Sequence, residues 1–383
     1  MAYYFIDGTI VSAGGSGAGT SGDPWGKTDD LLQYAVDQIL AGAGAGVAGD
    51  WISITAGNLT QTAFLNLATY APSNGRMLTI NGHDGYRPTI DMGGKPFFDQ
   101  KRDGIRLHNL RFFNLTNVTG EVSVHLRYHG SVSLCEFDGQ NQDFESVLRC
   151  EGSINVFGCR FVNFSPPAPS ANHGSLIFSG SSGGNWIKGC YFETGGGNDN
   201  YMIWSYGSFI EDCVFKYSGS GALGYAVIPI RQLRLSNCTF YRDPSAGVMY
   251  GTFFSNYQNC SMVNCYFENL TEPIYNSSYS VNGNVSTMLA GNRAYNSTNL
   301  YPSNAQYLPC PTLNYYNNDW DVSESLLIDP ANGDFRPKSG LIGAGFNMQD
   351  YGFPESMSKN PITIGGINGT STLIGQYNPF GGQ

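Results

Sequence analysis

Residues 130–137 read GSVSLCEF, and the Cys-x-Phe step that ends this stretch recurs along the chain. A cysteine stands two residues before a phenylalanine six times, with spacings of 24, 31, 23, 25 and 27 residues, at Cys135, Cys159, Cys190, Cys213, Cys238 and Cys265. Leu110-x-Phe112 precedes the series by 25 residues, and Asn292-x-Ala294 follows it by 27. Spacings in this range indicate repeated supersecondary units, so this period decides the fold.

The position just before each cysteine predicts a bend in every repeat. Seven of its eight occupants are Asn, Asp or Gly, and the full set is Asn109, Leu134, Gly158, Gly189, Asp212, Asn237, Asn264 and Gly291. These residue types tolerate the left-handed backbone region at low cost. Each repeat therefore reads as a strand, a tight bend with a left-handed residue, and a second strand that starts at the cysteine.

Side-chain alternation along the second strand places the cysteine and the aromatic residue on one face. The column between them is polar or large, which predicts that it faces outward: Arg111, Glu136, Arg160, Tyr191, Val214, Thr239, Tyr266 and Arg293. Stacked units would place equivalent residues about 4.8 Å apart, as an interior ladder of thiols beside a stack of rings. Residues 101–300 show no helical periodicity, so we expect an all-β solenoid of about 25 residues per coil.

This pattern resembles the right-handed parallel β-helix of the pectin-lyase-like superfamily, including β-helix proteins of phage tailspikes and virions; the resemblance alone implies the hand. The opening Asp23-Pro24-Trp25-Gly26 and the segment 329–336 resemble the segments that begin and close such rods. Residues 28–30 lead into apolar positions with helical spacing, which predicts a capping α-helix with an N-cap and an acidic first turn. We expect an N-terminal strand, loop and helix in residues 1–50, the β-helix in 51–345 and a C-terminal tail in 346–383.

Composition narrows the classes of function. The net charge of −10 and a charged fraction of 13% argue against a nucleic-acid partner. No apolar run is long enough for a membrane span, and the N-terminus lacks the features of a signal peptide. The nine cysteines are odd in number, and at least six read as buried ladder residues. The sequence has no CxxC or His-rich cluster, so we expect no metal, cofactor or ladder disulfide.

An apolar column is expected on the outer face of the strand before each bend. Its members are Leu176, Phe178, Met202, Trp204, Ile228 and Phe254. A contiguous apolar stripe on a solvated face marks contact with something. The sequence leaves three candidates for what covers this stripe: the chain's own loops or C-terminal segment, another subunit, or a stacked sugar.

Two groups of charged residues are candidates for catalysis. Asp138 and Glu193 follow their ladder cysteines by three residues and would lie two coils, or about 10 Å, apart. Glycoside hydrolysis uses two carboxylates at about this separation, one with a raised pKa. The second group is Asp143, Glu145 and Arg149 around one turn and strand. Either group is a candidate site, but solvated charges at turns are the favoured explanation of both.

The resemblance covers the scaffold only, because the four polygalacturonase motifs of this superfamily are absent. The first hypothesis is therefore a non-catalytic structural or receptor-binding component of a virion, such as a tailspike, fibre or capsid-decorating protein, or of a similar external assembly. It would be made in the cytoplasm without a signal peptide and would contact other virion proteins or a polysaccharide. Homotrimers are expected by analogy. The alternatives are a polysaccharide depolymerase, either a hydrolase or a lyase, and a secreted carbohydrate-binding β-helix.

Overall fold

The computed structural model describes residues 2–42, 49–67, 77–98, 103–116, 121–142, 146–164, 175–180, 184–195, 201–221, 223–254, 259–276, 286–298, 312–316 and 318–339. The chain divides into two compact units, Met1–Asn185 (unit 1) and Trp186–Gln383 (unit 2). Both are stacks of parallel β-coils, which confirms the predicted all-β parallel β-helix.

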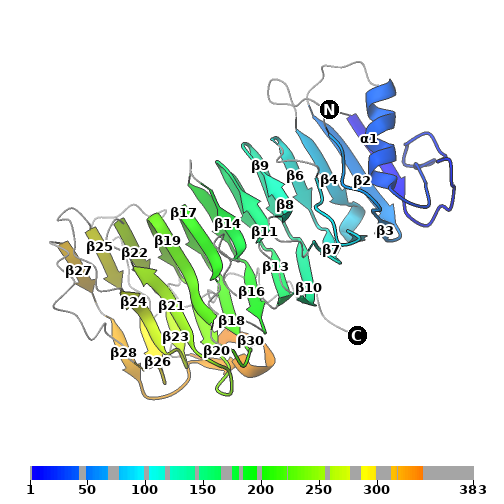
Figure 1. The fold of residues 1–383 in the computed structure, drawn as a ribbon. Coiled ribbons are helices and arrows are strands. Elements are labelled where there is room, and N and C mark those ends of the chain that lie inside the picture. Colours follow the sequence, from blue (N-terminus) through cyan, green and yellow to red (C-terminus); the bar gives the residue numbers. More distant parts are fainter. Residues whose placement is uncertain are drawn as a thin grey trace. The chain divides into compact units, whose positions relative to one another are not determined.

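Unit 1 has two parallel sheets and the α-helix of the described residues, α1 (Leu31–Gly42), at its N-terminal end (Figure 1). The first sheet contains β1 (Ala2–Asp7), β2 (Asp50–Ala56), β4 (Leu78–Gly82), β6 (Ile105–His108), β8 (Val122–Leu126), β9 (Gly130–Ser133), β11 (Ser146–Cys150), β12 (Ile154–Phe157) and β14 (Ser175–Ser179). The second contains β3 (Leu59–Thr60), β5 (Thr89–Asp91), β7 (Arg111–Phe113), β10 (Glu136–Gln142) and β13 (Arg160–Phe164). A 3-10 turn, η2 (His83–Gly85), follows β4.

Unit 2 repeats this plan. One sheet contains β15 (Asn185–Lys188), which starts at the last residue of unit 1, then β17 (Tyr201–Glu211), β19 (Leu223–Ser236), β21 (Met249–Phe254), β22 (Asn259–Val263), β24 (Glu272–Asn276), β25 (Ser286–Ala290) and β27 (Thr312–Tyr316). The other contains β16 (Tyr191–Thr194), β18 (Val214–Tyr217), β20 (Thr239–Arg242), β23 (Tyr266–Glu268), β26 (Arg293–Tyr295) and β28 (Asp319–Val322). An antiparallel hairpin follows, with β29 (Leu327–Asp329), η4 (Pro330–Asn332) and β30 (Asp334–Pro337).

The bends lie where the sequence predicts them. All eight residues before the ladder position have positive φ, between 52° and 63°. Leu134 is the exception in residue type, yet it adopts φ 54° like its neighbours in the series. The fixed bend carries each coil from one sheet to the other and keeps the repeats in register.

The interior ladders are also confirmed. All six ladder cysteines are buried thiols outside any disulfide, and each thiol donates to the carbonyl two residues before it at 3.2 to 3.6 Å. Burial raises the pKa of the Cys213 and Cys265 thiols, which keeps them protonated. In unit 2, the rings of Phe192, Phe215 and Phe240 stack with centroids 5.0 and 4.7 Å apart.

The start of the helix differs from the prediction. The helix begins at Leu31 and has no acidic residue in its first turn. Asp30 has φ 53°, and its carboxylate accepts the N–H and hydroxyl of Thr62 at 2.7 and 2.5 Å. The acidic residue therefore fastens a loop of the β-helix and does not cap the helix, because a left-handed residue turns its side chain away from the first helical amides.

The outward column is solvated only in part. In unit 2, Val214 and Tyr266 belong to this column, but both are fully buried under Leu327 and Phe335 of the C-terminal hairpin. The prediction that the column faces away from the cysteine and phenylalanine ladders holds. Exposure was the wrong expectation here, because the hairpin adds a second apolar layer that alternation within one strand cannot reveal. No helix among the described residues is long and apolar enough to cross a membrane.

Candidate functional site: a polar ladder on unit 1

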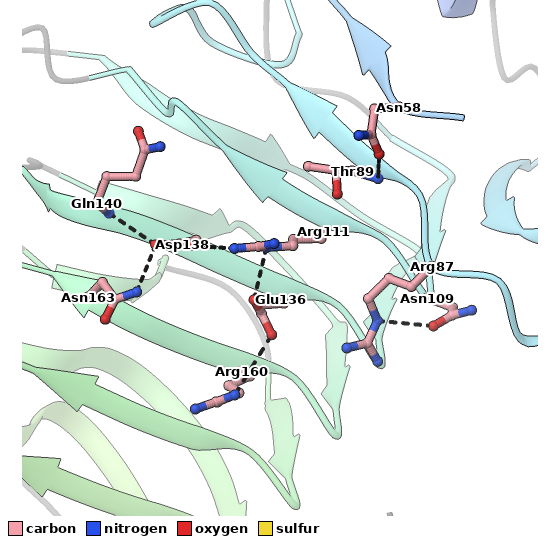
Figure 2. Close-up of polar contacts among 10 residues, drawn as sticks. All are labelled: Asn58, Arg87, Thr89, Asn109, Arg111, Glu136, Asp138, Gln140, Arg160 and Asn163. Carbon is pink, nitrogen blue, oxygen red and sulfur yellow. Dashed lines mark hydrogen bonds and ion pairs between the residues drawn. The ribbon is translucent and has the colours of Figure 1, made fainter. Parts of the chain in front are cut away.

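The outward column of the second sheet in unit 1 carries a ladder of charges. Parallel pairing sets Thr89 beside Arg111, Arg111 beside Glu136, and Glu136 beside Arg160. Their strands are β5, β7, β10 and β13, and Figure 2 shows the side chains on the same face of these strands. Opposite charges at successive rungs favour each other at the short distance between neighbouring strands.

Arg111 bridges two carboxylates. Its Nε lies 3.0 Å from Oε1 of Glu136, and its Nη2 lies 2.7 Å from Oδ2 of Asp138 (Figure 2). On the other side, Nη1 of Arg160 lies 3.9 Å from Oε2 of Glu136. The carboxylate side chains are 11% exposed, whereas Arg111 and Arg160 are 42% and 32% exposed. The guanidinium groups therefore form the solvent-facing rim, and the carboxylates lie beneath it.

Asp138 is held as a carboxylate. Burial alone would raise the pKa of Asp138, but hydrogen bonds from Asn163, Arg111 and the Gln140 N–H, together with the charge of Arg111, lower it below its ordinary value. The amide of Asn163 donates at 3.0 Å and the N–H of Gln140 at 3.1 Å, both to Oδ1 (Figure 2). An acid with this pKa is ionised at neutral pH, so Asp138 has no proton to give a leaving group.

The substitution Asp138→Asn is expected to lower the free energy of unfolding at pH 7 by about 1–2 kcal/mol, because hydrogen bonds to a charged group are lost or weakened. A depressed carboxyl pKa adds stability above the unfolded pKa, and that stability is lost as the pH falls through the folded pKa. The difference between wild type and Asp138→Asn should therefore shrink as the pH drops below about 4. Denaturant titrations from pH 3 to 7 measure it, and a gap that is constant with pH contradicts this account.

Arg87 completes the rim from the loop before β5. Its Nε donates to Oδ1 of Asn109 at 3.2 Å, and Asn109 is the left-handed residue of its own bend (Figure 2). Burial lowers the pKa of Arg87, and the charge of Glu136 opposes that shift; an arginine stays protonated in either case. We call Arg87, Arg111 and Arg160 the arginine rim. Asp91, two residues after Thr89 on β5, lies on the same outward face, so three arginines and three carboxylates share it.

The predicted catalytic pair is distributed over the two units. Asp138 lies in β10 of unit 1, and Glu193 lies in β16 of unit 2. Within unit 2, Oε1 of Glu193 is 3.2 Å from Nζ of Lys216, and Oε2 accepts the hydroxyl of Tyr191 at 3.1 Å. The carboxylates of Asp138 and Glu193 therefore each form an ion pair within their own unit.

Of the second predicted group, the structure describes Arg149. Asp143 and Glu145 lie outside the described residues. Arg149 places its Nε 3.3 Å from Oε1 of Glu151, and its guanidinium lies 4.7 Å from the centre of the Phe178 ring. The same carboxylate oxygen is 3.1 Å from Nε2 of His125. Arg149 therefore belongs to a polar cluster on the other sheet of unit 1.

Two of the six residues of the apolar stripe are buried within the chain, as expected where the chain itself covers the stripe. Leu176 and Met202 are 3% and 0% exposed, so neither lines an outer surface. The core residues that follow them, Ile177 and Ile203, are buried as well, so both faces of these strands are covered. Phe178 is half-buried opposite Arg149 in unit 1.

In unit 2, Trp204 and Ile228 are register partners, and both are half-buried. The next strand is offset by one residue from the sequence alignment, because Val227 pairs with Thr252 after a register shift in the β19–β21 pair. The backbone of Phe254 ends β21, and its side chain lies outside the described residues. The role of these residues as an interface remains a prediction.

Sequence reasoning placed Arg111, Glu136 and Arg160 in the outward column but did not recognise them as a site. The signal was present, since opposite charges alternate at this column in three successive repeats. Arg87 and Asn163 had no such signal, because both lie outside the column. Among the described residues, no group of three or more His, Cys, Asp or Glu side chains is arranged to hold a metal ion.

Comparison with known proteins shows no matching family model and no matching curated protein. Solved structures with a similar fold include a tailspike protein of E. coli bacteriophage HK620 in complex with a pentasaccharide, at 14% identity and a TM-score of 0.36. The matched region covers 69% of this chain and 62% of that one.

Another similar structure is the PL6 family alginate lyase AlyGC, at 11% identity and a TM-score of 0.36, with 87% of this chain and 58% of that chain covered. This chain thus spans about three fifths of the length of either solved chain. This likeness assigns neither an activity nor a ligand to the chain.

Proposed function

We propose that this chain is a non-catalytic structural or receptor-binding component of a virion, or of a similar external assembly, that displays the arginine rim on a rigid β-helix. The observation that carries the proposal is the state of Asp138, the best catalytic candidate. Its pKa is lowered and its two oxygens are held by Arg111, Asn163 and the Gln140 N–H. This is the environment of a structural charge.

A hydrolase on this scaffold would need a carboxylic acid with a raised pKa beside a second carboxylate that is open to water and substrate. Glu193 is paired with Lys216 and Tyr191, so it does not fill the second role without breaking that pair. Burial does raise the pKa of Glu268, but this side chain lies under the C-terminal hairpin, hydrogen-bonded to Ser325. Its position excludes a polysaccharide chain while the hairpin is docked.

The arginine rim gives the proposed contact its chemistry. Guanidinium groups bind carboxylate, phosphate and sulfate groups with paired hydrogen bonds, so the rim suits an acidic polysaccharide or an acidic patch on a neighbouring subunit. In this proposal the chain is part of a tailspike, fibre or decoration protein, with a homotrimer as the expected assembly. The depolymerase and the secreted carbohydrate-binding rod are the competing functions.

A panel of neutral and acidic bacterial and algal polysaccharides tests the proposal. Incubation with the purified chain is expected to release neither reducing ends nor unsaturated products, since Arg111 holds the carboxylate of Asp138 and Lys216 holds that of Glu193. Asp138→Asn and Glu193→Gln serve as paired variants, and light scattering gives the oligomeric mass of each preparation. Product release by wild type that disappears in either variant would establish the depolymerase and overturn the proposal.

A further inference from the structure

Two large aromatic side chains stand on the outer face of the first sheet of unit 2. Trp186 in β15 and Phe209 in β17 each lie four residues before the ladder cysteine of their coil, so they belong to one outward column. The two coils are adjacent, since the N–H of Gly189 donates to the carbonyl of Glu211 at 2.9 Å. Both aromatic side chains are 41% exposed. Exposed rings in neighbouring coils form an apolar surface that water covers poorly.

An arginine continues this column on the next strand. Arg234 in β19 is the register partner of Phe209, and Figure 1 shows β17 and β19 side by side. Its guanidinium carbon lies 5.1 Å from the centre of the Phe209 ring, and its side chain is exposed. We call Trp186, Phe209 and Arg234 the aromatic–arginine face.

The other cation beside these rings is already neutralised. Nζ of Lys188 lies 3.2 Å from Oε2 of Glu211 and 3.9 Å from Oδ2 of Asp212. The same nitrogen is 5.4 Å from the centre of the Trp186 ring. Within the part of unit 2 that the structure describes, Arg234 has no carboxylate partner. The aromatic–arginine face therefore keeps one cation available for an acidic group from outside.

The backbone next to Phe209 is open. Gly207 lies two residues before Phe209 on the same face of β17, and a Cβ atom built on it would meet no atom closer than 4.0 Å, the carbonyl oxygen of Gln232. The side chain of Gln232, its register partner, is exposed. Beside the Phe209 ring and Arg234 there is thus space above the sheet, with an amide at its edge.

The chemistry of this face selects a ligand with two kinds of surface. The C–H groups on one face of a sugar ring are apolar and weakly positive, so they pack on the negative face of an aromatic ring. A guanidinium group binds a carboxylate with paired hydrogen bonds. A purely apolar partner would cover the rings but would take Arg234 out of water without an acidic group, which is costly. A sugar that carries a carboxylate satisfies both requirements.

We propose that the aromatic–arginine face binds acidic sugar residues of a carboxylated polysaccharide, with sugar rings stacked on Trp186 and Phe209 and a carboxylate paired with Arg234. This inference goes beyond the proposed function, because it names a second contact surface and its ligand on unit 2. It applies equally to a chain that only binds a polysaccharide and to one that cleaves it.

Titration of the full chain with defined polymers tests the proposal. The acidic ligands are polygalacturonate, alginate and polysialic acid. Methyl-esterified polygalacturonate keeps the sugar rings without the charge, and polyglutamate keeps the carboxylates without the sugar rings. Wild type is expected to bind at least one of the three acidic polysaccharides, and to bind it about tenfold or more tightly than either control polymer, since each control lacks one of the two contacts.

Two variants remove the two contacts separately. Trp186→Ala removes the stacking surface, and Arg234→Gln removes the cation, so each is expected to weaken binding by about tenfold or more. Their matched controls lie in unit 1. Phe64 is an aromatic residue that is 45% exposed, and Arg106 is an exposed arginine four residues before the ladder position of its own coil. Phe64→Ala and Arg106→Gln should bind as wild type does.

The proposal is overturned if none of the three acidic polysaccharides binds, if polyglutamate binds as tightly as they do, or if either variant binds as wild type does. Binding that is lost in Arg160→Gln but kept in Trp186→Ala would assign the contact to the arginine rim, which overturns this inference and leaves the proposed function standing. Release of products overturns the proposed function alone. If Trp186→Ala does not fold, Arg234→Gln decides, because its side chain is exposed and its thermal unfolding should match wild type.

Discussion

Phe215→Ala is expected to lower the free energy of unfolding by about 3–5 kcal/mol. The ring of Phe215 is fully buried and lies between Phe192 and Phe240, with centroids 5.0 and 4.7 Å away and interplanar angles of 6° and 12°. Its removal leaves a cavity inside a stack whose two neighbours are fixed by strand pairing and cannot close the gap. The loss therefore includes both the transfer of the ring and the cavity.

Phe209→Ala is the matched control, since the same substitution is made in unit 2 at a ring that is 41% exposed. Phe209 lies on the outer face of β17 under the guanidinium of Arg234, 5.1 Å from the ring centre. Its truncation should cost about 1 kcal/mol or less. Denaturant titration of both variants under reducing conditions provides the comparison, and equal losses would mean that the phenylalanine stack is not the core of the coil.

Asn292→Ala is expected to cost about 3 kcal/mol, because it leaves several buried polar groups without partners. Asn292 occupies the ladder position that cysteine holds in the six preceding coils, and its side chain is fully buried. Its Oδ1 accepts the N–H of Cys265 at 2.9 Å, and its Nδ2 donates to the carbonyl of Met262 at 3.0 Å and to Oδ1 of Asn318 at 2.7 Å. The amide thus links three coils.

Asn155→Ala in β12 is the control, because that side chain is exposed on the outer face of its strand; a change within about 0.5 kcal/mol is expected. Thermal and chemical unfolding of the two variants give the difference. An Asn292→Ala loss as small as that of Asn155→Ala would show that water replaces the missing amide, and the asparagine would then have no special role in closing the ladder.

Much of the fold could be predicted because the bend and the inward-facing residues of each repeat depend on residues that are close together in the sequence. The residue before Cys135 is leucine, yet its bend is left-handed like the others, since seven equivalent residues in neighbouring coils fix the path of the chain. The cysteine and phenylalanine positions follow from alternation along one short strand. The helix was also predictable, but its first turn was not, because Asp30 bonds to Thr62 from a distant loop.

The candidate site could be predicted much less well. Alternation showed that Arg111 and Glu136 face outward, but it could not show that Asp138 shares the same guanidinium group. Leu176 and Met202 look like surface residues by alternation and are buried, since alternation describes a strand with one covered face. The shift that brings Thr252 beside Val227 depends on a register change in the pairing, which sequence spacing does not encode.

The sequence by itself determined the coil: its period, its left-handed bends, and the thiols and rings that point inward, because each of these depends on residues a few positions apart. Only the tertiary structure decided which outer faces are open. The arginine rim of unit 1 and the C-terminal hairpin over Val214 and Tyr266 of unit 2 both depend on contacts between residues far apart in the chain. Glu268 and Ser325, for example, are 57 positions apart and share a hydrogen bond. Such contacts, and the desolvation they impose on a carboxyl group, arise only when the coils are stacked.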